Sequence, residues 1–254
     1  MNILVTNDDG IDAPGLQALA NVLRDLGKVT VLAPDRNWSA MGHVKTLDRP
    51  LRVQKYTLAD GTPALTTDGA PSDCVAIAFL GLVEEKIDIV ISGINPFHNL
   101  GHDVTYSGTV TAAMEAAIWH TPSIAVSTDY SPDVGYEPTA KVAVHLARQV
   151  LNHGLPPDTL LNVNVPHVPF EHLRGLKITR QGTRVYKDEL VKRMDPHGRP
   201  YYWIGGKPPT GLMEKGTEIA ALDANWVSVT PLQLDLTAHA MLEEMQNWNL
   251  SLNL

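Results

Sequence analysis

The chain has 254 residues, of which 44% are hydrophobic and 19% charged, and its formal net charge is −8. A chain of this length and composition is typical of a globular protein with one large domain, or with one domain and an added lobe. The acidic balance and the lack of any run of lysines and arginines argue against a nucleic-acid polymer as partner, and the lack of an apolar run of roughly 18 residues argues against a membrane.

Two acids, Asp8 and Asp9, follow directly after a short apolar strand at the start of the chain, MNILVTNDDGIDAPG. Asp-Gly is a hairpin turn signal, so the simplest interpretation is that these residues only turn the chain. A hairpin needs a second strand of alternating polarity, and no such pattern follows. The acids also interrupt the apolar stretch that a secretory signal would need, so we expect a cytoplasmic protein.

A helix and a second strand come next instead. Apolar residues recur at helical spacing over 16–26, with Asp12 as the expected N-cap, Pro14 in the first turn and Gly27 at the end. The segment 28–34, KVTVLAP, then predicts another buried strand. Strand, helix and strand in about thirty residues form a βαβ unit with a parallel pair. The two acids therefore lie at the carboxyl end of a parallel strand, where open α/β sheets bind their ligands.

Strands and helices continue to alternate through the first two-thirds of the chain. The pattern predicts strands at 86–93, 123–128 and 160–166, and helices at 108–119 and 139–151. It indicates an α/β fold with a doubly wound, mostly parallel, Rossmann-like sheet over residues 1–175. The one cysteine, Cys74, lies in the apolar helical pattern SDCVAIAFL and is expected to be a packed core thiol rather than a nucleophile.

Residues 176–254 do not continue the alternation of strands and helices. Short β-like pieces (LKITR, VYKDEL, YYWIGG) are separated by Gly, Pro and charged residues, which predicts a β-hairpin-rich lobe or arm. The chain then closes with an amphipathic helix in TAHAMLEEMQNW. Aromatic residues between Arg184 and Gly211 and the apolar stripe of this helix need covering, so we expect both to pack on the core or on a partner subunit. A homodimer or homotetramer would satisfy this need.

Oxygen-bearing side chains follow three of the predicted strands. Asp8 and Asp9 come after the first strand, Ser39 after the second and Asn95 after the third. Because such loops converge on one edge of a doubly wound sheet, we expect these side chains to lie together. Two carboxylates, a hydroxyl and a carboxamide oxygen suit Mg²⁺ or Mn²⁺, so one divalent metal ion per subunit is expected.

Three histidines in the same loops are alternative ligands, although scattered loop histidines more often support a metal site than form it. They are His43, His98 and His102. Asp103 has the simpler interpretation of a loop hydrogen-bond acceptor.

The segment YSGTVTAAMEAA predicts an anion site. Ser107, Gly108 and Thr109 begin a helix, and free N–H groups at a helix start bind an anion without a lysine. Ser107 is equally well placed as an N-cap. The chain has no Walker GxxxxGK[ST] sequence and no GxGxxG after its first strand, which argues against an NTPase or a nicotinamide enzyme.

Seven segments between residue 3 and about residue 237 resemble the SurE family of survival-protein nucleotidases. They are ILVTNDDGIDAPGLQAL, APDRNWSAMGH, DGAPSDCV, SGINPFHNLGHDVTYSGTVTAAMEAA, LLNVNVP, TRQGTRVY and VSVTPLQLDLT. That family consists of divalent-metal-dependent phosphatases that hydrolyse nucleoside 5′- and 3′-monophosphates, and some members also trim short polyphosphate. The resemblance implies a 5′-nucleotidase that forms dimers or tetramers through extended arms and swapped C-terminal segments.

The matched positions also imply individual roles. The family's metal ligands fall on Asp8, Asp9, Ser39 and Asn95, of which the two acids are also expected to be catalytic. Its phosphate-contacting groups fall on Asn99, Ser107, Gly108 and Thr109.

Three positions depart from the family pattern: Phe97 and Ala40 stand where glycine is usual, and Ala116 follows Glu115 in the helix. We expect Phe97 to reshape the substrate mouth. Two points stay open at this stage. Attack by a metal-activated water competes with a phospho-aspartate on Asp8, and hydrolysis competes with non-catalytic binding of nucleotide or phosphate in the same cleft.

Overall fold

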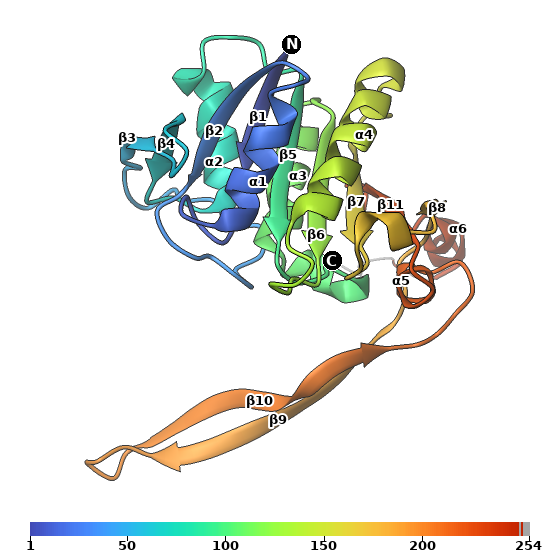
Figure 1. Cartoon of the computed structure of the whole chain (residues 1–254). Coiled ribbons are helices and arrows are strands. Elements are labelled where there is room, and N and C mark those ends of the chain that lie inside the picture. The colour runs from blue at the N-terminus through green and yellow to red at the C-terminus, as the bar shows by residue number, and fades with distance from the viewer. Residues whose placement is uncertain (249, 251–254) are drawn as a thin grey trace.

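The computed structural model describes residues 1–248 and 250 and shows one mixed sheet flanked by helices, with a long hairpin projecting from it (Figure 1). The sheet has nine strands in the order β3-β4-β2-β1-β5-β6-β7-β11-β8, while β9 and β10 pair separately. The strands are β1 (Asn2–Thr6), β2 (Lys28–Pro34), β3 (Val53–Thr57), β4 (Pro63–Thr67), β5 (Ile89–Asn95), β6 (Ser123–Thr128), β7 (Thr159–Val165), β8 (Leu176–Ile178), β9 (Arg184–Met194), β10 (Pro200–Gly211) and β11 (Val227–Gln233). The helices are α1 (Pro14–Leu23), α2 (Pro71–Ile77), η1 (Ala78–Leu82), η2 (Gly101–Thr105), α3 (Gly108–Ile118), α4 (Glu137–His153), η3 (Phe170–His172), α5 (Glu218–Asp223) and α6 (His239–Gln246).

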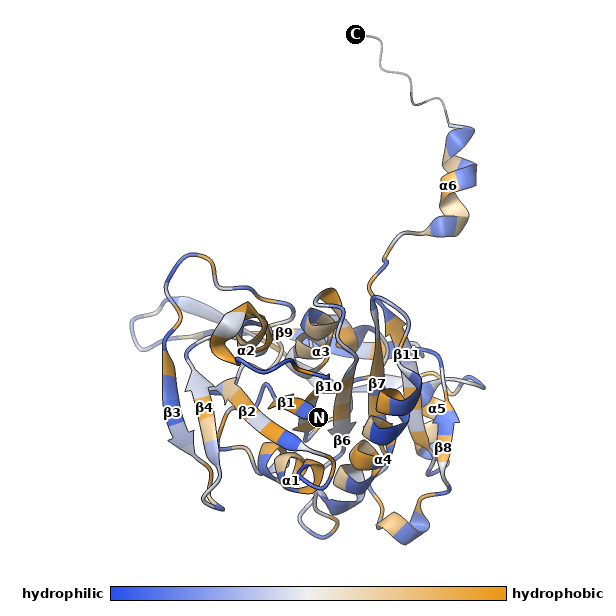
Figure 2. Cartoon of the chain, turned by 90° about the horizontal axis from the view of Figure 1, so that it is seen from above, coloured by the Kyte–Doolittle hydropathy of each residue, from blue (hydrophilic) through white to orange (hydrophobic). Residues whose placement is uncertain are grey.

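The centre of the sheet is doubly wound, as predicted. β2, β1, β5, β6 and β7 are mutually parallel, with α1 and α4 on one face and α2 and α3 on the other (Figure 2). Alternate residues of β1 serve the two faces: Ile3 and Val5 belong to the core cluster under α1 and α4, and Leu4 to the cluster under α2 and α3. Because both faces are covered, the central strands are buried on both sides and are rich in apolar residues.

The start of α1 differs from the prediction. The N-cap is Ala13 and makes no side-chain hydrogen bond, although Pro14 occupies the first turn as expected. Asp12 instead accepts a hydrogen bond from the Tyr56 hydroxyl. A helix can begin without a side-chain cap where Pro at its first position removes one of the free N–H groups.

Two other element boundaries differ from the prediction. α1 ends at Leu23, so Gly27 lies beyond the helix, where a Cβ would come within 2.4 Å of the Met1 carbonyl oxygen. β5 spans Ile89–Asn95 rather than 86–93, because its pairing with β1 begins at Ile89. Asn95 is consequently the last residue of the strand and is fixed by the sheet.

The stretch beyond residue 175 contributes to the sheet as well as to the hairpin. β11 pairs antiparallel with β7, and β8 pairs parallel with β11 at the sheet edge. β9 and β10 project from the body (Figure 1), and α6 stands apart from it with mostly exposed side chains (Figure 2). None of the helices in the described part of the chain is long and apolar enough to cross a membrane.

Candidate active site

The loops that follow β1, β2 and β5 meet at the carboxyl edge of the sheet, beside the base of the hairpin (Figure 1). They enclose a cavity of about 440 Å³. The structure therefore brings five of the predicted site residues to one place. The residues lining the cavity are Asp8, Ser39, Ala40, Asn95, Phe97, His98, Asn99, Asp103, Tyr106, Ser107, Arg184 and Pro209.

Asp8 is held between the end of β1 and the start of α3. Its side chain is buried, with 3% of the residue exposed, and it accepts a hydrogen bond from the Thr109 hydroxyl at 2.5 Å. Its backbone carbonyl accepts from the Trp38 amide at 2.7 Å, which ties the loop after β2 to the same point. Burial raises the pKa of Asp8, and the hydrogen bonds from Thr109 and Gly108 oppose this rise. Positive charge nearby would favour the ionised form of this acid.

Asp9 lies next to it in a tight turn. The turn is closed by Asn7, whose side chain accepts from the Gly10 amide at 3.3 Å and donates to the Gly10 carbonyl at 3.0 Å, with Gly10 at φ +105°. The two acids therefore do turn the chain, although no hairpin follows. Burial and the charge of Asp8 together raise the pKa of Asp9 to about 7. Two adjacent acids in this state favour a bound cation.

Asn95 and Ser39 complete the predicted ligand set. The Asn95 amide nitrogen donates to the Phe97 carbonyl at 2.6 Å, and within residues 1–248 and 250 its Oδ1 makes no hydrogen bond. Ser39 is exposed, and its amide donates to the Asn37 side chain at 2.7 Å. Over those same residues no three His, Cys, Asp or Glu side chains cluster as a metal site. The all-oxygen set of two carboxylates, a carboxamide and a hydroxyl fits Mg²⁺ or Mn²⁺.

The segment predicted to bind an anion forms the start of α3. Ser107 is the N-cap, and its hydroxyl accepts from the Val110 amide at 3.2 Å, so its structural role is realised while it also lines the cavity. The Thr109 hydroxyl is engaged by Asp8, and Thr109 is fully buried. Gly108 lies directly against Asp8, where a Cβ would come within 2.6 Å of the Asp8 Cβ. The side chain of Thr109 thus orients the acid, and the Gly108 and Thr109 N–H groups at the start of the helix are directed at the same carboxylate.

Asn99 is fixed by a buried amide network. Its side-chain nitrogen donates to the Ser127 hydroxyl at 2.8 Å, and its backbone amide donates to the Asn164 side chain at 2.8 Å. Asn162 and Asn164 both donate to its carbonyl. This network comes from β6 and β7, so the rigid sheet sets the position of Asn99.

The three histidines do not form a cluster, and two of them make hydrogen bonds near the site. His98 is half-buried and contacts the Val165 carbonyl at 2.8 Å, and desolvation lowers its pKa. His43 contacts the buried Glu115 at 3.0 Å and Lys45 contacts the same carboxylate at 2.9 Å. These bonds attach the loop that carries Ser39 to α3. His102 is exposed.

Several residues of the cavity wall were not predicted from the sequence. Arg184 and Pro209 come from the base of the hairpin, and Tyr106 precedes the N-cap of α3. Asp103 also lines the wall, where it forms an ion pair with Arg184. The segment TRQGTRVY, which contains Arg184, was a signal that could have pointed to this wall. Phe97 lines the cavity, as predicted, and is 70% exposed.

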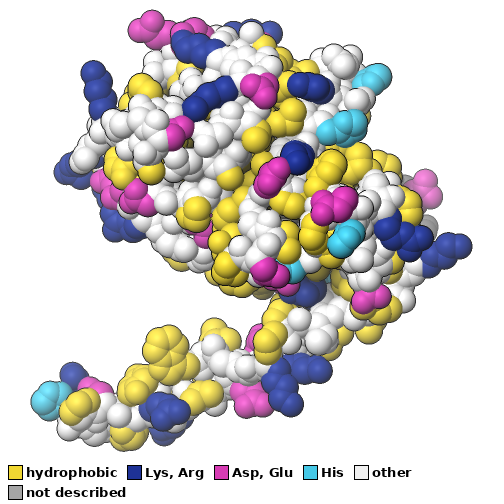
Figure 3. All heavy atoms as spheres, in the orientation of Figure 1, with side chains coloured by type: hydrophobic (Ala, Val, Ile, Leu, Met, Phe, Trp, Pro, Cys, Tyr) yellow, Lys and Arg dark blue, Asp and Glu magenta, His cyan; other side chains and the backbone are white. Residues whose placement is uncertain are grey.

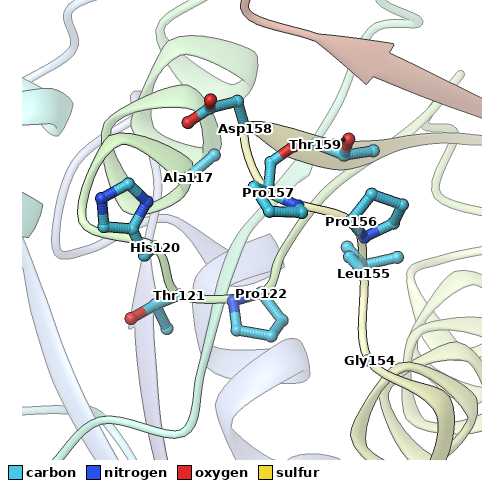
Figure 4. Close-up of a pocket in the computed structure, with 10 residues that line it drawn as sticks. All are labelled: Ala117, His120, Thr121, Pro122, Gly154, Leu155, Pro156, Pro157, Asp158 and Thr159. Atoms are coloured by element: carbon cyan, nitrogen blue, oxygen red, sulfur yellow. Dashed lines mark hydrogen bonds between the residues drawn. The ribbon is translucent and has the colours of Figure 1, made fainter.

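A second cavity, of about 230 Å³, lies at the opposite edge of the sheet, before β6 and β7 (Figure 4). Pro122, Pro156 and Pro157 form much of its wall, and Asp158 is its one carboxylate. It has no paired acids and no convergence of strand carboxyl ends. Cys74 is likewise outside the chemistry: it is fully buried and free, and burial raises the pKa of its thiol.

Comparisons with known proteins bear on this site. A family model described as "Survival protein SurE" matches residues 3–188. The chain is 54% identical over 250 residues to a protein named 5'-nucleotidase SurE from Chloroflexus aggregans (strain MD-66 / DSM 9485), covering 98% of this chain and 99% of that protein. A protein of the same name from Herpetosiphon aurantiacus is 50% identical over 253 residues, with 98% and 99% covered. The crystal structure of SurE protein from Aquifex aeolicus matches with a TM-score of 0.83 and 42% identity, covering 97% of this chain and 98% of that one.

Proposed function

Because the chain belongs to the SurE family, we propose that it is a divalent-metal-dependent phosphomonoesterase that hydrolyses nucleoside 5′- and 3′-monophosphates to nucleoside and phosphate. The observation that carries this proposal is the placement of Asp8. Its buried carboxylate lies against the start of α3, next to Asp9 and Asn95. A phosphate and two acids share such a place only when a cation lies between them.

We propose that one Mg²⁺ or Mn²⁺ ion is held by Asp8, Asp9, Asn95 and Ser39 and that the phosphate lies against Ser107, Gly108, Thr109 and Asn99. When bound, the cation would polarise the phosphoryl group and lower the pKa of the attacking water. The positive end of the α3 dipole and the Asn99 side chain would stabilise the charge on the phosphoryl oxygens. The exposed ring of Phe97 offers a face on which a base can stack, which is worth about 1–3 kcal/mol where it occurs.

Water is the proposed nucleophile. Asp9 is half-buried and makes no side-chain hydrogen bond within the described residues, so it is free to accept the proton of the attacking water. Asp8 is more deeply buried and is engaged by Thr109, which suits a group that holds its position. A phospho-aspartate on Asp8 is the competing route.

The deciding experiment is phosphate release from AMP. We expect release with added Mn²⁺, none after chelation with EDTA, and recovery when metal is restored, because the acids cannot accept a phosphate without a cation. Tripolyphosphate tests the further exopolyphosphatase activity in the same assay. Full activity in rigorously metal-stripped protein would reject the site, and metal-dependent AMP binding without phosphate release would indicate the non-catalytic alternative.

We further propose a homodimer or homotetramer in the cytoplasm, with the hairpin and α6 packed on partner subunits. Hydrophobic side chains lie along the hairpin (Figure 3), where Tyr202, Trp203 and Ile204 are 53%, 64% and 85% exposed. Leu242 of α6 is 49% exposed. Apolar surface of this extent is typical of subunit contacts. A free, buried cysteine fits a reducing compartment.

Light scattering at low micromolar concentration checks the assembly. We expect a mass that is a multiple of 27.7 kDa, and a lower or less stable multiple when the chain is truncated after Leu236. The truncation should leave Mn²⁺ binding unchanged, because α6 stands apart from the body that holds the cavity (Figure 2). A full-length monomer would reject the proposal.

A further inference from the structure

Arg184 is the first residue of β9 and lines the active-site cavity from the hairpin side. It is the one lysine or arginine among the cavity-lining residues, all of which belong to the described part of the chain. The other charged groups on the wall, Asp8 and Asp103, are acids. A cavity proposed to take an anionic substrate therefore contains a single cationic side chain, and the proposed roles above leave that side chain unused.

The guanidinium is held in a fixed orientation. Its Nε donates to one oxygen of Asp103 at 2.7 Å, and the Tyr186 hydroxyl donates to the other oxygen at 2.7 Å. The side chains of Arg184 and Asp103 are only 15% and 20% exposed. Within residues 1–248 and 250, the two Nη groups of Arg184 make no hydrogen bond. An arginine so held presents its remaining N–H donors as a ready-made fork.

The base of the hairpin is seated firmly against η2. The Gln181 side chain donates to the Gly101 carbonyl at 3.0 Å, and the buried Glu218 accepts from the Gly101 amide at 2.7 Å. Gly101 has φ +52°, and a Cβ there would lie 2.5 Å from the Gly182 carbonyl oxygen and 3.0 Å from the Arg184 Cγ. The close approach requires glycine and leaves Arg184 little freedom to move away from the cavity.

The same loop reaches the anion-binding helix start. The Asp103 carbonyl accepts from the amides of Tyr106 and Ser107 at 3.0 and 3.1 Å. One residue thus connects the arginine of the hairpin to the N-cap of α3. The two positive features of the cavity, a cationic fork and a helix start, are joined through a single short loop.

We propose that Arg184 binds phosphate oxygens of the substrate, so that the base of the hairpin is part of the binding site. This rests on the function proposed above. A guanidinium fork matches phosphate oxygens in geometry and charge. Asp103 then acts as a positioning residue, because its carboxylate orients the Arg184 guanidinium and does not itself bind the anionic substrate.

The test compares Arg184→Gln and Arg184→Lys with Arg148→Gln, a control that removes an exposed arginine on α4. We expect Arg184→Gln to raise the KM for AMP about tenfold or more, since hydrogen bonds to charged groups contribute on that scale. The Kd of inorganic phosphate for the Mn²⁺-loaded protein, measured by calorimetry, should rise in parallel. Mn²⁺ affinity should not change, Arg184→Lys should recover part of the loss, and the control should match wild type.

Tripolyphosphate identifies which phosphate is contacted. An equal rise in KM for AMP and tripolyphosphate places Arg184 on the reacting phosphoryl group, and a larger rise for tripolyphosphate places it on a second phosphate. Unchanged KM for both substrates and unchanged phosphate affinity in folded Arg184→Gln would overturn the proposal. A wild-type protein that binds phosphate but releases none from AMP would instead reject the proposed hydrolysis, and the phosphate titration would still judge Arg184.

Discussion

Asp9→Asn is expected to lower kcat about 100-fold or more, a loss typical of removing a positioned acid or base. The substitution removes one of two adjacent carboxylates and with it a charge that the cation requires. Metal affinity should fall as well, measured as the Kd for Mn²⁺ by calorimetry. The fold should persist, because Asp9 lies in a half-buried turn that Asn7 and Gly10 close between themselves.

The matched control is Asp25→Asn, which removes the same charge from an exposed position between α1 and β2, at the far end of the sheet. It should leave kcat, Mn²⁺ affinity and Tm near their wild-type values. If Asp9→Asn also kept normal turnover and metal content, Asp9 would serve only the turn of residues 7–10.

The sequence pattern was sufficient for the centre of the fold and the convergence of the acids. Strands buried on both faces are rich in apolar residues, so 28–34, 123–128 and 160–166 were recognisable within one or two residues. Placement of Asp8 at the end of β1 then followed from the βαβ rule alone. The family comparison confirms the fold class and the resemblance.

The edges of the sheet were not predictable in the same way. β3 has the sequence VQKYT and lies at the edge with mostly exposed side chains, so no apolar run marks it. The sequence of β11 was recognisable as a motif, but its antiparallel pairing with β7 was not. β7 ends at Val165 and β11 begins at Val227, so the two strands are separated by more than sixty residues. Pairings this distant are decided by tertiary packing and not by local pattern.

Within the site, the sequence pattern identified individual residues but not the residues that they contact. Ser107 to Thr109 were expected at a helix start, but no sequence pattern indicates that the Thr109 hydroxyl donates to Asp8. Arg184 lies more than seventy residues beyond Ser107, in a segment whose composition predicts an arm. It reaches the cavity because Gly101 permits a close contact with the base of the hairpin. Such contacts exist only in the folded chain.

Gly108→Ala is expected to impair the site severely through one added methyl group. A Cβ at position 108 would lie 2.6 Å from the Asp8 Cβ and 3.0 Å from its Oδ2. Asp8 cannot retreat, because its backbone carbonyl is bonded to Trp38 and its carboxylate to Thr109. Gly108 is the first residue of α3, so the helix start cannot shift without losing its cap at Ser107.

The methyl group must therefore displace either Asp8 or the start of α3, and both belong to the proposed site. Overpacking of this kind costs about 1–3 kcal/mol in the free energy of unfolding. We expect the Mn²⁺ affinity to fall at least tenfold and kcat to fall by a comparable factor. A displacement of the reacting groups by about 1 Å can slow catalysis on the order of a hundredfold. Ser107→Ala is the matched comparison: it removes the cap at about 1 kcal/mol without pressing on Asp8, so it should lower Tm while Mn²⁺ binding stays normal. Equal Mn²⁺ affinity in Gly108→Ala and wild type would show that the contact between α3 and Asp8 does not set the metal site.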